Sequence, residues 1–134
     1  MTQNPNAQET HYQRIGGEQG VKALVDRFYN LMDTLPEAAD IRRIHAANLS
    51  SARSKLFDFL SGWMGGPPLF VEKYGHPRLR QRHLPFPIGT KERDQWLLCM
   101  YRAMADTHVP EDLAEELKPL FFRTADFMRN QADK

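Results

Sequence analysis

The sequence predicts an all-α protein made of one domain. Apolar residues recur every three to four positions along four long stretches, which is the spacing of an amphipathic helix. No stretch alternates apolar and polar residues as a half-buried strand does. Hydrophobic residues make up 41% and charged residues 26% of the 134 residues, which is ordinary for a globular domain and argues against disorder.

Two helices are predicted in the first half of the chain. The first covers residues 18–33 and follows the glycine pair at 16–17, and a short helical or irregular connection over 37–47 then ends at His45. Ser50 or Ser51 is expected to cap the second helix, which the Gly-Gly-Pro-Pro run at 65–68 ends. The apolar stripes of these helices are Val21, Leu24, Val25, Phe28, Leu31 and Met32, followed by Ala52, Leu56, Phe59, Leu60 and Trp63.

The second half begins with irregular chain and ends with two long helices. Residues 69–75 are predicted to form a loop with one turn, and a brief helix opens at His76-Pro77. Thr90 is expected to cap a helix that runs to about residue 106. The last helix opens at 110–112 and should be kinked by an internal proline, Pro119. The apolar stripes here are Trp96, Leu97, Met100 and Met104, followed by Leu113, Leu117, Leu120, Phe121, Thr124 and Met128.

Charge and cysteine content narrow the classes of partner and compartment. The net charge of +1 supplies no general attraction to nucleic acid or to a membrane surface, and no apolar run is long enough to span a bilayer. A single cysteine, Cys99, excludes an internal disulfide and suits a reducing compartment. The first ten residues are polar, so the cytoplasm is the expected location. We expect a domain over residues 12–130, with flexible tails at 1–11 and 131–134.

A histidine on the brief helix is the best candidate for chemistry. No HExxH, GxSxG or phosphate-loop motif is present. His83 lies on an element bounded by prolines, and such a rigid element suits a metal ligand. Spacing alone favours the simpler interpretation, a histidine at the end of a helix, and His76 on the same face is the rival candidate. Cys99 is best explained as a small buried hydrophobe.

Two aromatic residues with polar tips lie on apolar helix faces. Tyr29 and Trp96 each need a hydrogen-bond partner when buried, and either a side chain or a bound ligand would serve. The apolar set around them fits simple core packing and equally fits a large apolar cofactor pocket. Arg78, Arg80 and Arg82 are either a solvated face or partners for an anionic ligand.

Motifs in register along the chain carry a family resemblance. They are Gly16-Gly17, Phe28-Tyr29, Gly65-Gly66-Pro67, the run YGHPRLRQRHLPF at 74–86 and the run ERDQWL at 92–97. Over about residues 12–129 the chain strongly resembles a group II truncated haemoglobin. The resemblance implies a two-over-two helical sandwich that encloses haem b, iron protoporphyrin IX.

The resemblance also implies roles for individual residues. His83 would be the proximal iron ligand at a pentacoordinate iron, and Tyr29, Trp96 and His45 would surround the ligand position. Arg82, with Lys55 or Arg80, would meet the haem propionates. The other expected pocket residues are Ala52, Leu56, Phe59, Leu60, Leu79, Phe86, Ile88 and Met100.

The function expected from the resemblance is binding of O2, and of the related gases NO and CO. Converging O–H and N–H donors predict slow O2 release, which favours sensing, scavenging or redox chemistry over bulk oxygen transport. One alternative is a haem-based redox enzyme, an NO dioxygenase or a peroxidase, that needs a separate electron donor. Another is a helical interaction module without haem. A monomer or a weak homodimer is expected, with no nucleic-acid or membrane partner.

Overall fold

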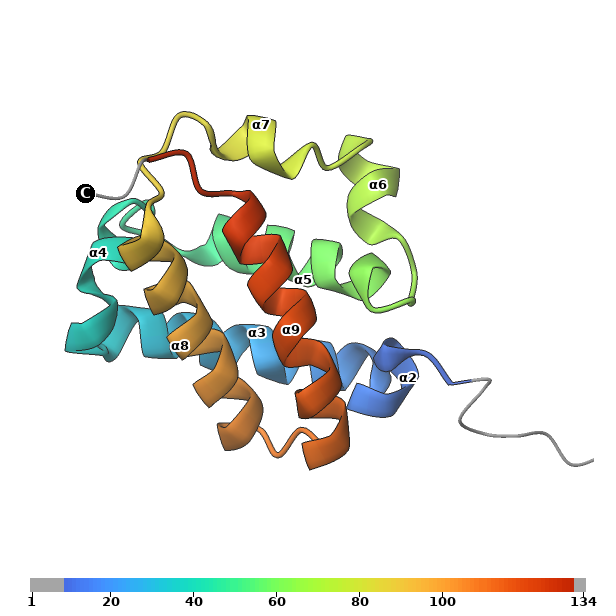
Figure 1. Ribbon diagram of the computed structural model, residues 1–134. Coiled ribbons are helices and arrows are strands. Elements are labelled where there is room, and N and C mark those ends of the chain that lie inside the picture. The colour runs from blue at the N-terminus through green and yellow to red at the C-terminus, as the bar shows by residue number, and fades with distance from the viewer. Residues whose placement is uncertain (1–8, 132–134) are drawn as a thin grey trace, which may run out of the picture.

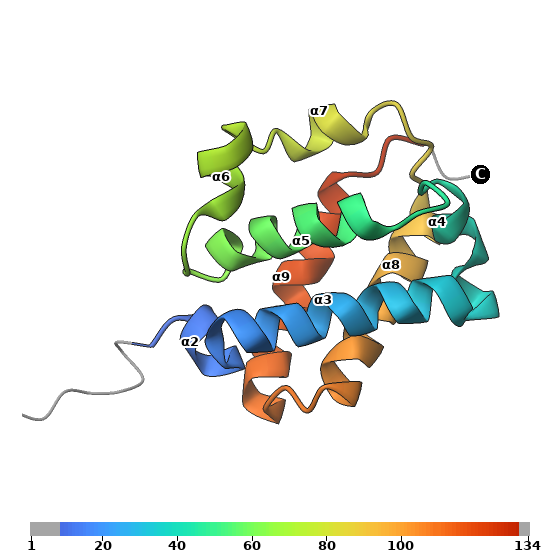
Figure 2. The ribbon, with the colours of Figure 1, turned by 180° about the vertical axis from the view of Figure 1, so that it is seen from behind.

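Two pairs of crossed helices form the body of the protein, and the computed structural model describes residues 9–131. Helices α8 (Thr90–Asp106) and α9 (Glu111–Phe127) lie in front of α3 (Gly17–Thr34) and α5 (Ser50–Trp63) in Figure 1. The view from behind shows α3 and α5 as the layer that α8 and α9 cross (Figure 2). The predicted two-over-two sandwich is confirmed, and residues 9–131 contain no strand.

The core lies where the two layers meet. The stripe predicted for α3 is fully buried, whereas the stripe of α5 is only partly buried apart from Leu60, and α3 packs against both α5 and α8. Burial of this surface is the main favourable term in folding. The largest side chains that are almost completely buried include Leu24, Phe28, Leu60, Met100, Met104, Leu117 and Phe121.

A short helix that the sequence pattern did not predict precedes α3. Helix α2 (His11–Ile15) is closed by a capping box in which Thr10 and Gln13 exchange hydrogen bonds. Gly16 has a φ of +107°, a left-handed conformation that glycine adopts without strain, and it joins α2 to α3. Residues 1–8 of the predicted N-terminal tail and 132–134 of the C-terminal tail lie outside the described residues.

Two predicted helix caps are wrong. Helix α5 begins at Ser50, so Leu49 occupies the cap position and has no side chain that could accept a hydrogen bond, and the side-chain oxygen of Asn48 accepts the Ser50 N–H at 2.8 Å. Helix α8 begins at Thr90, so Gly89 is the residue before the helix, and the Glu92 carboxylate accepts the Gly89 N–H at 2.8 Å.

The segment between α5 and α8 is more helical than predicted. Residues 69–75 hold α6 (Leu69–Tyr74) rather than a loop, because Phe70 is buried and packs edge-on against Phe59 of α5. The brief helix α7 (Leu79–His83) begins later than the predicted His76-Pro77 start. Arg78 has a left-handed backbone and its N–H donates to Nδ1 of His76, so a turn precedes the helix.

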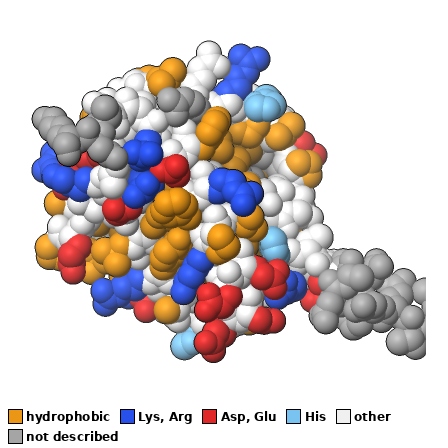
Figure 3. Space-filling model, viewed as in Figure 1, with side chains coloured by type: hydrophobic (Ala, Val, Ile, Leu, Met, Phe, Trp, Pro, Cys, Tyr) orange, Lys and Arg blue, Asp and Glu red, His pale blue; other side chains and the backbone are white. Residues whose placement is uncertain are grey.

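The remaining connections are short, and the front face of the sandwich carries some exposed apolar side chains. The predicted short connection is confirmed as η1 (Pro36–Ala38) and α4 (Ala39–Arg43). Figure 3 shows hydrophobic side chains among charged ones over α8 and α9, and Leu98 and Phe122 of these helices are exposed. Within residues 9–131, no helix has both the length and the apolar character needed to cross a bilayer.

Candidate functional site

His83 is the last residue of α7, and its ring is oriented by its own helix. Nδ1 lies 2.6 Å from the carbonyl oxygen of Leu79. Because a carbonyl oxygen only accepts, Nδ1 must carry the hydrogen in this bond, which leaves a lone pair on Nε2 of the neutral ring. Within residues 9–131, Nε2 has no hydrogen-bond partner. A histidine with one nitrogen bonded to a carbonyl and the other free has the arrangement typical of a metal ligand.

His45 repeats this arrangement in the turn after α4. Its Nδ1 donates to the carbonyl oxygen of Ile41 at 2.9 Å. Burial lowers the pKa of His45, although the bond to Ile41 opposes this, and the positive charges of Arg42 and of a protonated His83 lower it further. The ring is therefore neutral at neutral pH.

Gln95 binds the backbone N–H of Ile41, the residue whose carbonyl oxygen orients His45, and sequence reasoning missed it. Its side-chain oxygen accepts the Ile41 N–H at 3.0 Å, and its amide donates to the Asp40 carboxylate at 2.8 Å. Arg43 and Gln95 both bind Asp40 and lower the pKa of that carboxyl group. The residue before Trp96 in α8 therefore anchors α4. A lone glutamine within a helix carries no sequence signal for such a contact.

Tyr29 lies in α3 beside His45 with its hydroxyl group unpaired. The ring is 5% exposed and makes edge contacts with Phe28 and His45, with centroids 4.8 and 5.9 Å apart. The hydroxyl makes no hydrogen bond within the described chain, and its oxygen is accessible to a water molecule. Burial raises the pKa of Tyr29 far above its usual value, so the group is an O–H donor at neutral pH.

Trp96 completes the set of polar tips. Its ring contacts Phe28 at a centroid distance of 5.1 Å and Phe121 at 5.9 Å. The indole N–H, like the Tyr29 hydroxyl, has no hydrogen-bond partner in residues 9–131 and is accessible to a water molecule. Phe28 contacts both Tyr29 and Trp96, so the two rings that carry unpaired donors, one from α3 and one from α8, pack against the same buried ring.

Arg53 is a second residue that the sequence analysis did not single out. Its guanidinium group lies 5.8 Å from the centre of the Tyr29 ring, and its positive charge partly opposes the rise in the pKa of Tyr29. The same group donates to the Asp26 carbonyl at 3.1 Å and to the Asn30 side chain at 2.7 Å. It therefore holds α5 against α3 at the level of Tyr29.

The predicted apolar pocket residues divide by burial. Leu60, Met100 and Ile88 are buried, and Leu60 and Met100 belong to the central core. Phe86 is 43% exposed on the loop after α7. The partly buried members are Ala52, Leu56, Phe59 and Leu79.

The predicted anion partners lie in α5 and α7. The Lys55 ammonium group is 5.8 Å from the Tyr74 ring centre, and the Arg82 guanidinium group is 5.4 Å from that of Phe70. Arg80 lies in α7, and its side chain is outside the described part of the structure. These contacts place Lys55 and Arg82 at one exposed edge of the molecule beside α6.

Two rival candidates are separate from this cluster. His76 is exposed, and its Nδ1 accepts the N–H of Arg78, so that nitrogen is already occupied. Cys99 has no exposed surface, and burial raises the pKa of its thiol to about 11, so it is a thiol and not a thiolate at neutral pH. Cys99 is therefore a small buried side chain, as predicted, and His76 has only its other ring nitrogen available to a ligand.

The donor set fits a haem better than a metal ion held by side chains alone. Among the described residues, no group of three or more His, Cys, Asp and Glu side chains could hold a metal ion. A single oriented imidazole suits an iron whose other ligands come from a macrocycle. The unpaired donors of Tyr29 and Trp96 pack against aromatic rings. They would suit a small polar ligand bound within an apolar pocket.

Comparison with known proteins identifies the family. The model of the bacterial-like globins matches residues 10–130. The group 2 truncated hemoglobin YjbI of Bacillus subtilis is 38% identical over 122 residues, which cover 91% of this chain and 89% of that protein. The chain belongs to the group II truncated haemoglobins. As in the globin family generally, its fold is one that binds diatomic gases on a haem.

Solved structures of bacterial haemoglobins superpose closely on this one. The group II 2-on-2 hemoglobin of the plant pathogen Agrobacterium tumefaciens superposes with a TM-score of 0.91 at 50% identity, covering 98% of this chain and all of that one. A truncated oxygen-avid haemoglobin from Bacillus subtilis has a TM-score of 0.83 at 38% identity and covers 91% of this chain and all of that one. These likenesses extend over the whole truncated haemoglobin domain.

Proposed function

We propose that this truncated haemoglobin binds O2, and also NO and CO, on a haem b held by His83. The observation that carries the proposal is the His83 ring, whose Nδ1–H bond to Leu79 leaves Nε2 free and fixed in direction. A bound haem iron would supply an open coordination position for a diatomic ligand. The oxygen-avid relative from Bacillus subtilis supports O2 as the ligand.

The chain's own side chains would stabilise a ligand at that position. Tyr29 offers an O–H and Trp96 an N–H, and both groups are unpaired within residues 9–131. Neutral His45 packs against Tyr29 and keeps a lone pair on Nε2, which would accept a hydrogen bond from a water molecule near the ligand. Donors that are already ordered by packing lose little freedom when they bind a ligand. This arrangement favours tight binding and slow release.

Other residues would hold the haem itself. Leu60, Met100 and Phe59 supply apolar surface, as a large flat cofactor requires. Lys55 and Arg82 are cations at the exposed edge beside α6, where they suit the two carboxylates of the haem. Of the side chains described here, His83 alone would bind the iron.

Absorption spectroscopy of the haem-supplied protein tests the proposal. We expect a Soret band at one haem per chain that shifts when CO is added to the reduced protein. His83→Ala should lose the stoichiometric band, whereas His76→Ala should keep it, because His76 is exposed and already bonded to Arg78. Stoichiometric haem and an unchanged CO shift in His83→Ala would refute His83 as the ligand. Absence of a stable Soret band from the wild type would favour the haem-free interaction module.

A further inference from the structure

Asn130, just past the end of α9, binds the backbone on both sides of the loop that follows His83. Its side-chain amide donates to the carbonyl oxygens of His83 at 3.2 Å and Phe86 at 2.7 Å. Its side-chain oxygen accepts the Ile88 N–H at 2.9 Å, and its own N–H donates to the Ile88 carbonyl at 2.7 Å. One residue near the C-terminus therefore makes four hydrogen bonds to residues 83–88.

The loop needs such a partner because it cannot satisfy its own backbone. Pro85 and Pro87 lack an N–H group, and a helix leaves its last carbonyls without intrahelical partners. The Leu84 N–H donates to the Gln81 carbonyl at 3.3 Å and the Phe86 N–H to the His83 carbonyl at 3.0 Å, which leaves the carbonyl of Phe86 and both backbone groups of Ile88 to partners outside the loop. Helix α7 has five residues, which is too short to be stable without outside contacts.

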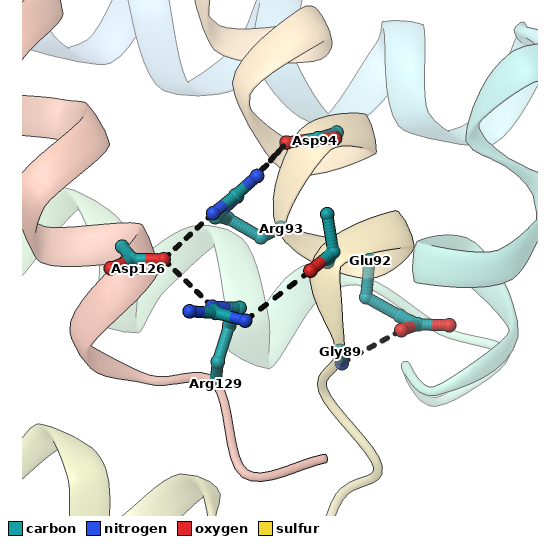
Figure 4. Close-up of polar contacts among 7 residues, drawn as sticks. Gly89, Glu92, Arg93, Asp94, Asp126 and Arg129 are labelled. Carbon is teal, nitrogen blue, oxygen red and sulfur yellow. Dashed lines mark hydrogen bonds and ion pairs between the residues drawn. The ribbon is translucent and has the colours of Figure 1, made fainter. Parts of the chain in front are cut away.

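The chain next to Asn130 is fixed in turn by a charged cluster (Figure 4). Asp126 accepts hydrogen bonds from Arg93 and Arg129, each at 2.7 Å, and these bonds lower the pKa of its carboxyl group. Arg129 also donates to the Thr90 hydroxyl at 3.3 Å. The end of α9 is thereby held against the first turn of α8. Asn130 follows directly and meets the loop from this anchored position.

We infer that Asn130 is a positioning residue for His83. It holds the carbonyl of His83 and the loop after it, and so sets the depth and direction at which the imidazole meets the iron. The inference rests on the proposed role of His83. An amide is the side chain that fits, since it donates to two carbonyls and accepts from an N–H at the same time.

The nearly isosteric Asn130→Asp variant tests the inference in the haem-loaded chain. The carboxylate keeps the acceptor for the Ile88 N–H but loses both donors and faces two carbonyl oxygens. We expect haem transfer to excess apomyoglobin to quicken by roughly ten- to hundredfold, and the iron–histidine stretching band of the reduced protein to shift or broaden. An unchanged band together with haem loss within about twofold of wild type would overturn the inference.

Two control variants separate positioning from general loss of stability. Gln131→Ala removes a neighbouring exposed side chain and keeps all four Asn130 bonds to the loop. Leu117→Val weakens the core of α9 away from the loop. Both should keep the wild-type iron–histidine band. A band shift in Leu117→Val as large as that in Asn130→Asp would assign the effect to stability and overturn the inference.

A second measurement does not depend on haem. In the full chain as purified, Asn130→Ala should speed exchange of the Ile88 amide hydrogen by about tenfold relative to amides in the middle of α8. Wild type without an iron–histidine band would refute the proposed role of His83, while faster Ile88 exchange would still establish that Asn130 holds the loop. Unchanged Ile88 exchange would overturn the inference whatever the haem content.

Discussion

His45 and His83 are oriented by the same local device and lie within electrostatic reach of each other. Each ring donates its Nδ1 hydrogen to the carbonyl four residues earlier, at 2.9 Å for His45 and 2.6 Å for His83. Each therefore keeps an Nε2 lone pair when the ring is neutral, and burial is the main cause that lowers the pKa of His45. Their surroundings differ, since His45 packs against buried Tyr29 whereas His83 ends a short surface helix. The difference suits a distal role for His45 and a proximal role for His83.

Tyr29→Phe should speed O2 release. The variant removes one O–H donor from the proposed ligand position, and a hydrogen bond to a charged group contributes about 1.5–3 kcal/mol. That corresponds to roughly ten- to hundredfold in the dissociation rate, measured by stopped-flow displacement of O2 with CO. Tyr101→Phe is the control, because its hydroxyl binds the Lys118 carbonyl instead. Equal dissociation rates in wild type and Tyr29→Phe would remove Tyr29 from the proposed donors.

Tyr29 should also make the stability of the chain sensitive to alkali. Burial raises the pKa of Tyr29 in the folded state above the usual value of about 10. The unfolded chain therefore loses this proton first as the pH rises, so the contribution is complete below about pH 10 and is lost above it.

Urea unfolding on both sides of that pH tests the expectation. The free energy of unfolding should fall more steeply above about pH 10 in wild type than in Tyr29→Phe. Tyr74→Phe, which alters an exposed ring, should follow the wild-type curve. Parallel curves for wild type and Tyr29→Phe would contradict a buried, protonated Tyr29.

Gln95→Ala should loosen the distal side. The change frees the Ile41 N–H and removes a partner of Asp40, so residues 40–41, next to the carbonyl that binds His45, lose their anchor on α8. We expect a loss of about 1–2 kcal/mol in the free energy of unfolding and an O2 release rate between those of wild type and Tyr29→Phe. Thermal unfolding and stopped-flow measurements check the two effects. Release as slow as in wild type would show that Ile41 orients His45 without help.

Lys73→Met should destabilise the contact between α5 and α6. Asp58 is 2% exposed and its carboxylate binds the Lys73 ammonium group at 3.0 Å. Removal of the cation leaves a buried charge unpaired. We expect a cost of only about 1–3 kcal/mol in the free energy of unfolding, because the half-exposed Lys73 site admits water. Adding Asp58→Asn should recover most of the loss in urea unfolding. A double variant no more stable than Lys73→Met would argue against an unpaired carboxylate as the cause.

Local patterns in the sequence were sufficient to predict the four long helices. The apolar period marks α3, α5, α8 and α9 to within a residue or two, because an amphipathic helix needs only its own spacing. The motifs at 74–86 and 92–97 were sufficient to identify the family. Helix α6 was missed because its stability comes from burial of Phe70 against α5, a contact that no local pattern encodes.

The sequence by itself thus determined the helical class, the order of the long helices and the residue types available to a haem, since each depends on near neighbours in the chain. Only the tertiary structure brought Gln95 to Ile41, Arg53 to Tyr29 and Asn130 to the loop after His83. These partners are far apart along the chain. The crossing of the two helical layers decides which of them meet, because hydrogen bonds act over only about 3 Å.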